Sequence, residues 1–162
     1  MLTCTVFHAA ASAVSGEMKT VGWSERVRIY PGGMLFLAKL DTGARNSSIN
    51  AKNIREFERD GEPWVRFDVE NRSKKSMTIE LPQFREAKIK RHFGDRQHRP
   101  VVLMGICLDR YYRETQVTLV DREGFLYGLL IGRSYLKHKF VVDSSVQYTT
   151  QPECRLPDDD EK

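Results

Sequence analysis

One short segment constrains this chain of 162 residues more than any other part of it. Residues 37–40, Leu-Ala-Lys-Leu, have the composition of a strand, and Asp41, Thr42 and Gly43 follow directly. Glycine permits backbone conformations and close approaches that a side chain would block, so Gly43 marks a turn. The segment therefore places a carboxylate at the end of a strand, and this Asp-Thr-Gly tripeptide occurs once in the chain.

A strand-end Asp-Thr-Gly is the form in which aspartic proteases present a catalytic carboxylate. Their chemistry needs two carboxylates so close that they share one proton, one activating a water molecule while the other donates to the substrate carbonyl. Because the signature at Asp41 occurs once, its partner must come from a second copy of the chain across a two-fold axis. The sequence thus predicts that dimerisation is part of the active site.

Two alternatives stay open for these carboxylates. Asp-Thr-Gly is also an ordinary turn sequence, so the tripeptide at Asp41 is a weak signal by itself. Asp143 is a candidate second carboxylate within the same chain, although no Thr-Gly follows it and its position fits the end of a strand.

From residue 21 onward, short apolar runs alternate with turn signals, a pattern that predicts an all-β domain. The first two runs flank the turn sequence Pro-Gly-Gly at 31–33 and predict a hairpin that delivers Asp41. The expected strands are 21–30, 34–40, 47–51, 63–70, 76–81, 84–93, 100–108, 113–120, 125–131 and 140–143.

Three connections in this pattern are distinctive. Residues 56–61 are charged and predict a connection between strands. The polar residues 94–99 predict the tip of a long hairpin that projects into solvent. A short helix is expected at 133–139, directly after Gly132.

The two ends of the chain are expected to lie outside a single domain at 21–150. Leu2 to Val14 is apolar and contains Ala-Ser-Ala, the form of a signal-peptidase site, but no Lys or Arg precedes it. Residues 1–20 are therefore interpreted either as the remnant of an export signal or as a tail. The location of the protein stays unknown, with a periplasmic or exported one slightly favoured. Residues 151–162 are acidic at their end and predict a tail that does not pack.

Composition argues against several classes of partner. The net charge is +4, with a local excess of basic residues at 85–99, but no nucleic-acid motif accompanies it, so no nucleic acid is expected. No run of 18 apolar residues exists, so no membrane span is expected.

The three cysteines, Cys4, Cys107 and Cys154, form no close pair, which argues against a disulfide framework and predicts packed or free thiols.

Further motifs occur together with the Asp-Thr-Gly signature. They are Gly22-Trp23, residues 39–45, residues 59–65, residues 99–102, and Ile131-Gly132-Arg133 leading to residues 139–143. On these motifs, which cover about 21–148, the chain resembles the retropepsin-like aspartic proteases. More narrowly, it resembles bacterial proteins labelled ATP-dependent zinc proteases or RimK-associated proteases.

The resemblance implies a small closed β-barrel of the retropepsin type, with one lobe per chain and one short C-terminal helix. It implies a homodimer in which Asp41, Thr42 and Gly43 of each chain form the catalytic loop. Thr42 would bond across the dimer, and Gly94 would lie in a hairpin that covers the cleft. The substrate-binding residues implied are Ala44, Arg45, Gly94, Ile131, Gly132 and Arg133.

The activity implied is that of an aspartic endopeptidase acting on a peptide or protein at acidic to neutral pH. The alternative is a non-catalytic peptide-binding or processing partner of a RimK-type ATP-grasp ligase. A zinc hydrolase is the third reading, but the four histidines show no His-Glu-x-x-His spacing. No phosphate-binding glycine loop is present either, so neither a metal nor another cofactor is expected.

Overall fold

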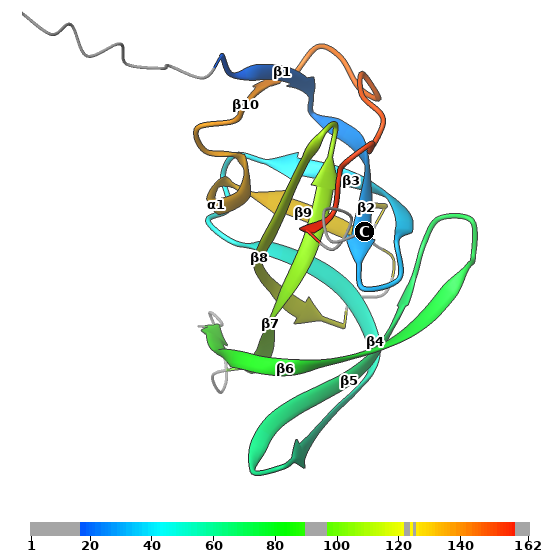
Figure 1. The fold of residues 1–162 in the computed structure, drawn as a ribbon, viewed down its shortest axis with the longest axis vertical. Helices are drawn as coiled ribbons and strands as arrows, with labels where there is room; N and C mark the ends of the chain where they lie inside the picture. Colours follow the sequence, from blue (N-terminus) through cyan, green and yellow to red (C-terminus); the bar gives the residue numbers. More distant parts are fainter. Residues whose placement is uncertain (1–16, 90–96, 122–123, 125, 158–162) are drawn as a thin grey trace, which may run out of the picture.

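The computed structural model describes residues 17–89, 97–121, 124 and 126–157. Its architecture is the expected all-β one, with one short helix. The resemblance to the retropepsin type implied a closed barrel, and the strands of the main sheet do form a closed ring (Figure 1).

The ring is built around the hairpin that carries Asp41. Strand β2 (Ser24–Tyr30) pairs antiparallel with β3 (Met34–Asp41), as predicted. On its other side β3 pairs parallel with β9 (Leu129–Gly132), which pairs antiparallel with β4 (Ser47–Arg59). Strand β4 also pairs parallel with β8 (Tyr111–Val120), and β7 (Gln97–Leu108) joins β8 back to β2. The strand that ends at Asp41 is therefore held on both edges.

The barrel encloses the core because side chains alternate between the two faces of each strand. Along β3, Met34, Phe36, Ala38 and Leu40 are buried, while Leu35 and Lys39 between them are exposed. At about 25 cal/mol per Å² of apolar surface removed from water, such inward side chains supply most of the stabilisation of the fold.

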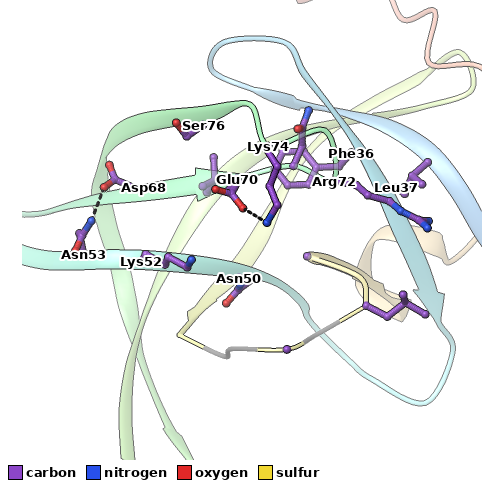
Figure 2. A pocket seen from close by; sticks show the side chains of 15 residues that line it. Phe36, Leu37, Asn50, Lys52, Asn53, Asp68, Glu70, Arg72, Lys74 and Ser76 are labelled. Atoms are coloured by element: carbon purple, nitrogen blue, oxygen red, sulfur yellow. Dashed lines mark hydrogen bonds and ion pairs between the residues drawn. The ribbon is translucent and has the colours of Figure 1, made fainter.

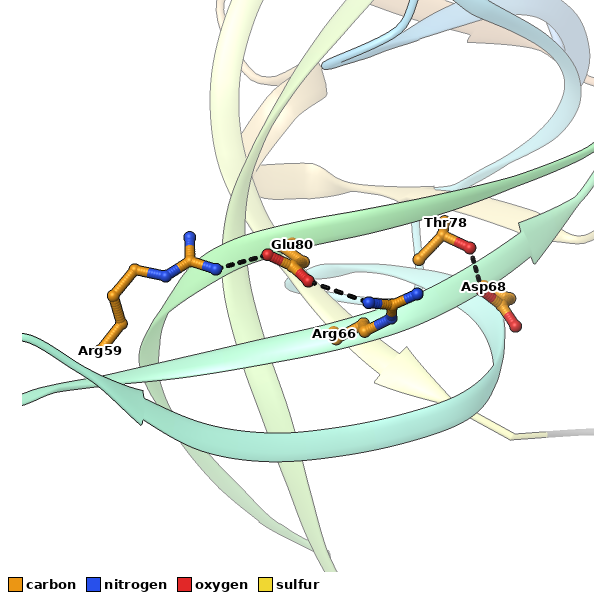
Figure 3. Close-up of polar contacts among 5 residues, drawn as sticks. All are labelled: Arg59, Arg66, Asp68, Thr78 and Glu80. Carbon is orange, nitrogen blue, oxygen red and sulfur yellow. Dashed lines mark hydrogen bonds and ion pairs between the residues drawn. The ribbon is translucent and has the colours of Figure 1, made fainter.

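A three-stranded extension projects from the barrel where a connection was expected. Strand β4 continues through residues 56–59 and pairs with β5 (Glu62–Glu70), so the charged connection predicted at 56–61 is wrong except for its turn. Strand β6 (Ser76–Ile89) pairs with β5 and then with β7. The predicted long hairpin is thus present, but residues 97–99 of its expected tip already belong to β7. The two strands expected at 76–81 and 84–93 are one continuous strand as far as Ile89. On the outer face, Glu80 bridges Arg59 at 2.5 Å and Arg66 at 3.3 Å (Figure 3).

A second, two-stranded sheet lies at the end of the barrel beside helix α1 (Arg133–Leu136). Its strands, β1 (Lys19–Gly22) and β10 (Phe140–Asp143), pair parallel to one another. The predicted first strand at 21–30 is therefore two strands with a break at Trp23. Residues 19 and 20 belong to β1, so the expectation that the first twenty residues all lie outside the fold is wrong for these two.

Two residues near the C-terminal end of the described chain are bonded to the barrel. Cys154 forms a disulfide with Cys107, which corrects the expectation of free or merely packed thiols. The Glu153 N–H donates to the carbonyl of Asp109 at 2.7 Å. The expectation that residues 151–162 do not pack is thus wrong for residues 153 and 154, and 158–162 lie outside the described residues. None of the described helical residues forms a segment long and apolar enough to cross a bilayer.

Candidate active site

Asp41 lies at the end of β3, directly opposite Gly132 of β9 in the parallel pair. One residue earlier, the Leu40 N–H donates to the carbonyl of Trp23 at 2.8 Å. The strand that carries the carboxylate is thus held by β2, by β9 and by Trp23, the residue before β2.

The turn after Asp41 is closed by its own side chain. Oδ1 accepts hydrogen bonds from the backbone N–H of Gly43 at 3.0 Å and of Ala44 at 3.1 Å. This is the local side-chain-to-backbone pattern that favours Asp before a tight turn. Oδ2 accepts no hydrogen bond from any residue that the structure describes, and Thr42 and Gly43 are exposed. One carboxylate oxygen is therefore anchored, while the other is available at an open surface.

The first two residues of helix α1 are hydrogen-bonded to Ala44 and Arg45, which follow the turn. The backbone N–H of Arg133 donates to the carbonyl of Ala44, and that of Ser134 donates to the carbonyl of Arg45, both at 2.9 Å. Just before them, the Gly132 N–H donates to the buried Ser47 hydroxyl at 3.1 Å. The segments 41–47 and 132–134 are thus joined by direct hydrogen bonds, although they lie far apart in sequence.

Gly132 is required by this close approach and not by an unusual backbone angle. A Cβ atom built there would lie 2.5 Å from both the carbonyl carbon and the carbonyl oxygen of Asn46. Backbone atoms cannot move aside as a flexible side chain can, so any larger residue would separate the two segments. Gly132 and the fully buried Ile131 therefore lie beneath the loop, and their contact with substrate stays a prediction.

Arg133 contacts the Asp41 loop with its side chain as well as its backbone. Its Nη1 donates to the carbonyl oxygens of Thr42 and Gly43, each at 2.8 Å. Bonds from a charged donor are stronger than neutral ones, and one guanidinium nitrogen here serves two successive carbonyls. The structure thus shows that Arg133 braces the loop. Its predicted contact with substrate stays a prediction.

Arg45 and the neighbouring Asn46 line a hollow of about 580 Å³ beside the loop. Sequence reasoning did not single out a second arginine there, Arg85 of β6, which lay within the basic excess at 85–99. The Nε and Nη2 atoms of Arg85 donate to Gln116 Oε1 at 2.9 and 2.8 Å, so this guanidinium is held in place. Glu114 also lines the hollow, which therefore carries charges of both signs.

Gly94 and Asp143 are the remaining predicted residues. Gly94 lies outside the described residues, although its hairpin is paired as far as Ile89 and Gln97. Asp143 ends β10, as expected, and hydrogen bonds from the hydroxyl and the backbone N–H of Ser145 lower its pKa. It belongs to the two-stranded sheet and not to the sheet that carries Asp41.

A hollow of about 660 Å³ lies away from the loop, between β3, β4 and β5 (Figure 2). The Asp68 carboxylate there accepts a hydrogen bond from Asn53 at 2.7 Å, and Glu70 pairs with Lys74 at 3.0 Å. None of the predicted site residues lines this hollow.

The described residues do not fit a metal centre. Within 17–89, 97–121, 124 and 126–157, no three His, Cys, Asp or Glu side chains are grouped so that they could hold a metal ion.

The RimB-like family model, described as retropepsin-like aspartic endopeptidase RimB, matches residues 20–153. A "probable alpha-L-glutamate ligase" of Shewanella halifaxensis is 37% identical over 114 residues, which are 68% of this chain and 25% of that protein. A protein of the same description from Desulfotalea psychrophila is 31% identical over 113 residues, 68% of this chain and 24% of that protein. This chain thus spans about a quarter of the length of these curated relatives.

A solved structure is similar over most of the chain. The crystal structure of a Legionella pneumophila protein of unknown function has a TM-score of 0.71 and 34% sequence identity. The similarity covers 82% of this chain and 98% of that one.

Proposed function

Because this chain belongs to the RimB-like family of retropepsin-like aspartic endopeptidases, we propose that it hydrolyses peptide bonds with a water molecule held between two copies of Asp41. Each chain of a homodimer supplies one copy. The observation that carries the proposal is the state of the Asp41 carboxylate, whose Oδ1 is anchored by Gly43 and Ala44. Its Oδ2 receives no hydrogen bond within the described part of the chain and is available for water and for a partner carboxyl.

The reaction needs one proton on the carboxylate pair. The ionised Asp41 takes a proton from the water as the water oxygen attacks the peptide carbonyl carbon, and the protonated Asp41 donates to the carbonyl oxygen. As the tetrahedral intermediate collapses, the C–N bond breaks and a proton passes from the pair to the leaving amine. The pair regains one proton from the intermediate, so the cycle closes without a cofactor.

Two features support a homodimer. Thr42 and Gly43 are exposed beside Asp41, so a second loop can approach the first across a two-fold axis. Strands β1 and β10 form a sheet of only two strands, which is marginal by itself, and Val141 of β10 is 46% exposed. A second copy would extend this sheet and cover the apolar side chain.

Subunit mixing tests the shared dyad. Wild-type protein is mixed with an equal amount of the Asp41→Asn variant and allowed to exchange subunits before peptide cleavage is measured. If both carboxylates are needed, mixed dimers are inactive and the activity per total protein falls to about one quarter of the wild-type value. A fall to about one half means that each chain acts alone and rejects the dyad.

The ligase relatives favour a particular class of peptide. They are named probable alpha-L-glutamate ligases and contain a region similar to this chain, so we infer that the substrate is a glutamate-rich peptide made by such a ligase. Arg45 and Arg85 beside the loop supply guanidinium groups for its side-chain carboxylates. Cleavage of an oligo-α-glutamate peptide, with an oligo-lysine peptide of equal length as control, tests this class.

The second candidate function is a non-catalytic peptide-binding partner of the same kind of ligase. The observation that favours it is the occurrence of the similar region within proteins named as ligases and not as peptidases. It predicts that wild-type protein and Asp41→Asn bind oligo-α-glutamate equally well and that neither cleaves it. Cleavage by wild-type protein alone excludes this candidate.

A further inference from the structure

The C-terminal segment 144–157 forms a strap across the barrel, and Figure 1 shows it running from β10 over the region of β2 and β3. The Trp23 N–H donates to the carbonyl of Val146 at 3.0 Å, and the Tyr148 N–H donates to the carbonyl of Ser24 at 2.8 Å. The strap is therefore bonded to the very residues that lead into β2.

The strap also satisfies a buried charge. The side chain of Glu25 is fully buried, and its two oxygens accept hydrogen bonds from the backbone N–H and the hydroxyl groups of both Thr149 and Thr150. The remaining bond comes from the Gly22 N–H at 2.7 Å. A buried carboxylate without donors is strongly unfavourable, so Glu25 depends on the strap being closed.

Trp23 connects the strap to the strand that carries Asp41. Its N–H donates to Val146 of the strap, and its carbonyl accepts the N–H of Leu40, the residue before Asp41. Glu25 and Ser24 pair with Ala38 and Lys39 in the same hairpin. Movement of the strap therefore acts on a peptide unit that directly contacts β3.

One covalent bond closes the strap. Cys154 is joined to Cys107, a buried residue near the end of β7, across a sequence separation of 47. A disulfide holds a chain segment mainly by excluding open conformations, so its reduction makes these conformations accessible. A dithiol can carry out this step: its two thiols become a disulfide, and two electrons and two protons convert Cys107 and Cys154 to thiols.

We propose that the strap is a redox-controlled latch: reduction of the Cys107–Cys154 disulfide lets residues 146–154 open and loosens the hydrogen bond from Leu40 to Trp23. The latch thereby couples the thiol state of the C-terminal segment to the rigidity of the strand that ends at Asp41. This inference stands on the geometry of the strap and does not depend on peptidase activity.

Native-state hydrogen exchange of the full chain tests the latch. The Cys4→Ser variant, which retains the disulfide but has no third thiol for exchange, is compared before and after treatment with dithiothreitol. The amides of Thr149 and Thr150 are expected to exchange at least roughly tenfold faster after reduction, because local opening releases them. The Leu40 amide is expected to accelerate by a similar factor, while amides of the β5–β6 pair stay unchanged.

Three results would overturn the proposal. Unchanged Thr149 and Thr150 amides mean that the strap stays closed without the disulfide. An unchanged Leu40 amide, with a strap that opens, means that opening does not reach β3. Equal acceleration of the β5–β6 amides means that reduction unfolds the whole domain and releases no local latch.

A second variant tests the same coupling with the disulfide intact. Thr149→Val removes one hydroxyl donor to Glu25 at an exposed position, where the substitution does not disturb the core. A smaller acceleration at Leu40 and Thr150 is expected. Unchanged exchange at both amides counts against the coupling between strap and strand.

Discussion

The Nη1 atom of Arg133 lies 2.8 Å from the carbonyl oxygen of Gly43, so the first residue of the helix holds the loop that presents the carboxylate. The same atom holds the carbonyl of Thr42 at the same distance. A neutral donor would bond these two carbonyl oxygens more weakly than the charged guanidinium does.

We therefore predict that Arg133→Ala lowers kcat/KM for peptide cleavage by roughly 10²-fold, because small displacements of a reacting group are costly. The free energy of unfolding, measured in urea, should fall by only about 1.5 kcal/mol, the lower end of the usual range for hydrogen bonds that involve a charged group, because Arg133 is exposed. Lys137→Ala, an exposed change in the same turn of chain, serves as the control. Full activity in Arg133→Ala would show that the loop holds its geometry without this brace.

Gly132→Ala tests the close approach beneath the loop. The added Cβ would lie 2.5 Å from backbone atoms of Asn46, so β9 and the loop must separate. We expect a loss of roughly 3 kcal/mol in the free energy of unfolding, as for a side chain forced into a packed site. Gly128→Ala is the matched control, because its nearest atoms lie at 3.7 Å, an ordinary contact. Equal stability of the two variants would contradict the packing described for Gly132.

Much of the fold can be predicted from the sequence because most strands face the core on one side only. The alternation along β3 and β5, together with the turn residues between strands, gave their positions directly. The far half of β4 could not be found this way, since its residues beyond Lys52 are largely exposed on both faces and read as a charged loop. Polar strands that extend beyond a core carry no such alternation.

The site was predictable at Asp41 but not in the contacts that support it. Asp-Thr-Gly after an apolar strand is a local signal, and the opposing Gly132 is a local one too. The brace by Arg133, by contrast, joins residues 90 positions apart in the sequence. The burial of Glu25 could not be predicted either, because the C-terminal strap that buries it is far away in the sequence. The disulfide joins two cysteines 47 positions apart, and this spacing is not typical of any motif.

Glu25 should make the free energy of unfolding depend on pH in the acidic range. Burial acts to raise its pKa, but hydrogen bonds from Thr149, Gly22 and Thr150 outweigh it and lower the pKa below the ordinary value of 4.5. Because the folded-state pKa lies below the unfolded one, the stabilisation is present above about pH 4.5 and is lost as pH falls through the folded value.

We predict that Glu25→Gln lowers the free energy of unfolding by about 1–3 kcal/mol at pH 7, because the amide NH2 group faces hydrogen-bond donors. The difference from wild type should shrink below pH 4.5, which a series of urea unfolding curves at several pH values can measure. Exposed carboxylates with lowered pKa values, such as Glu80, add acid sensitivity to both proteins and cancel in the comparison. A difference that stays constant down to pH 2.5 would mean that Glu25 gains nothing from its charge.

The hollow beside the loop is expected to bind the proposed glutamate-rich substrate through Arg85. Arg85 is held by Gln116 and has little freedom to lose when it meets a carboxylate, so its contribution to binding should be large for an exposed site. Arg85→Ala is expected to raise KM for an oligo-α-glutamate peptide by roughly tenfold, the effect of one charge-assisted contact. The kcat value should change little, because the contact is made equally in the ground state and the transition state.

Two controls separate recognition from general electrostatics. Arg55→Ala removes an equal charge from the outer face of the extension, away from the hollow, and should leave KM unchanged. Gln116→Leu keeps the charge of Arg85 but removes its anchor, and an intermediate rise in KM is expected because the guanidinium must then be ordered on binding. Equal effects of Arg55→Ala and Arg85→Ala would assign the preference to the net charge of the protein and not to this hollow.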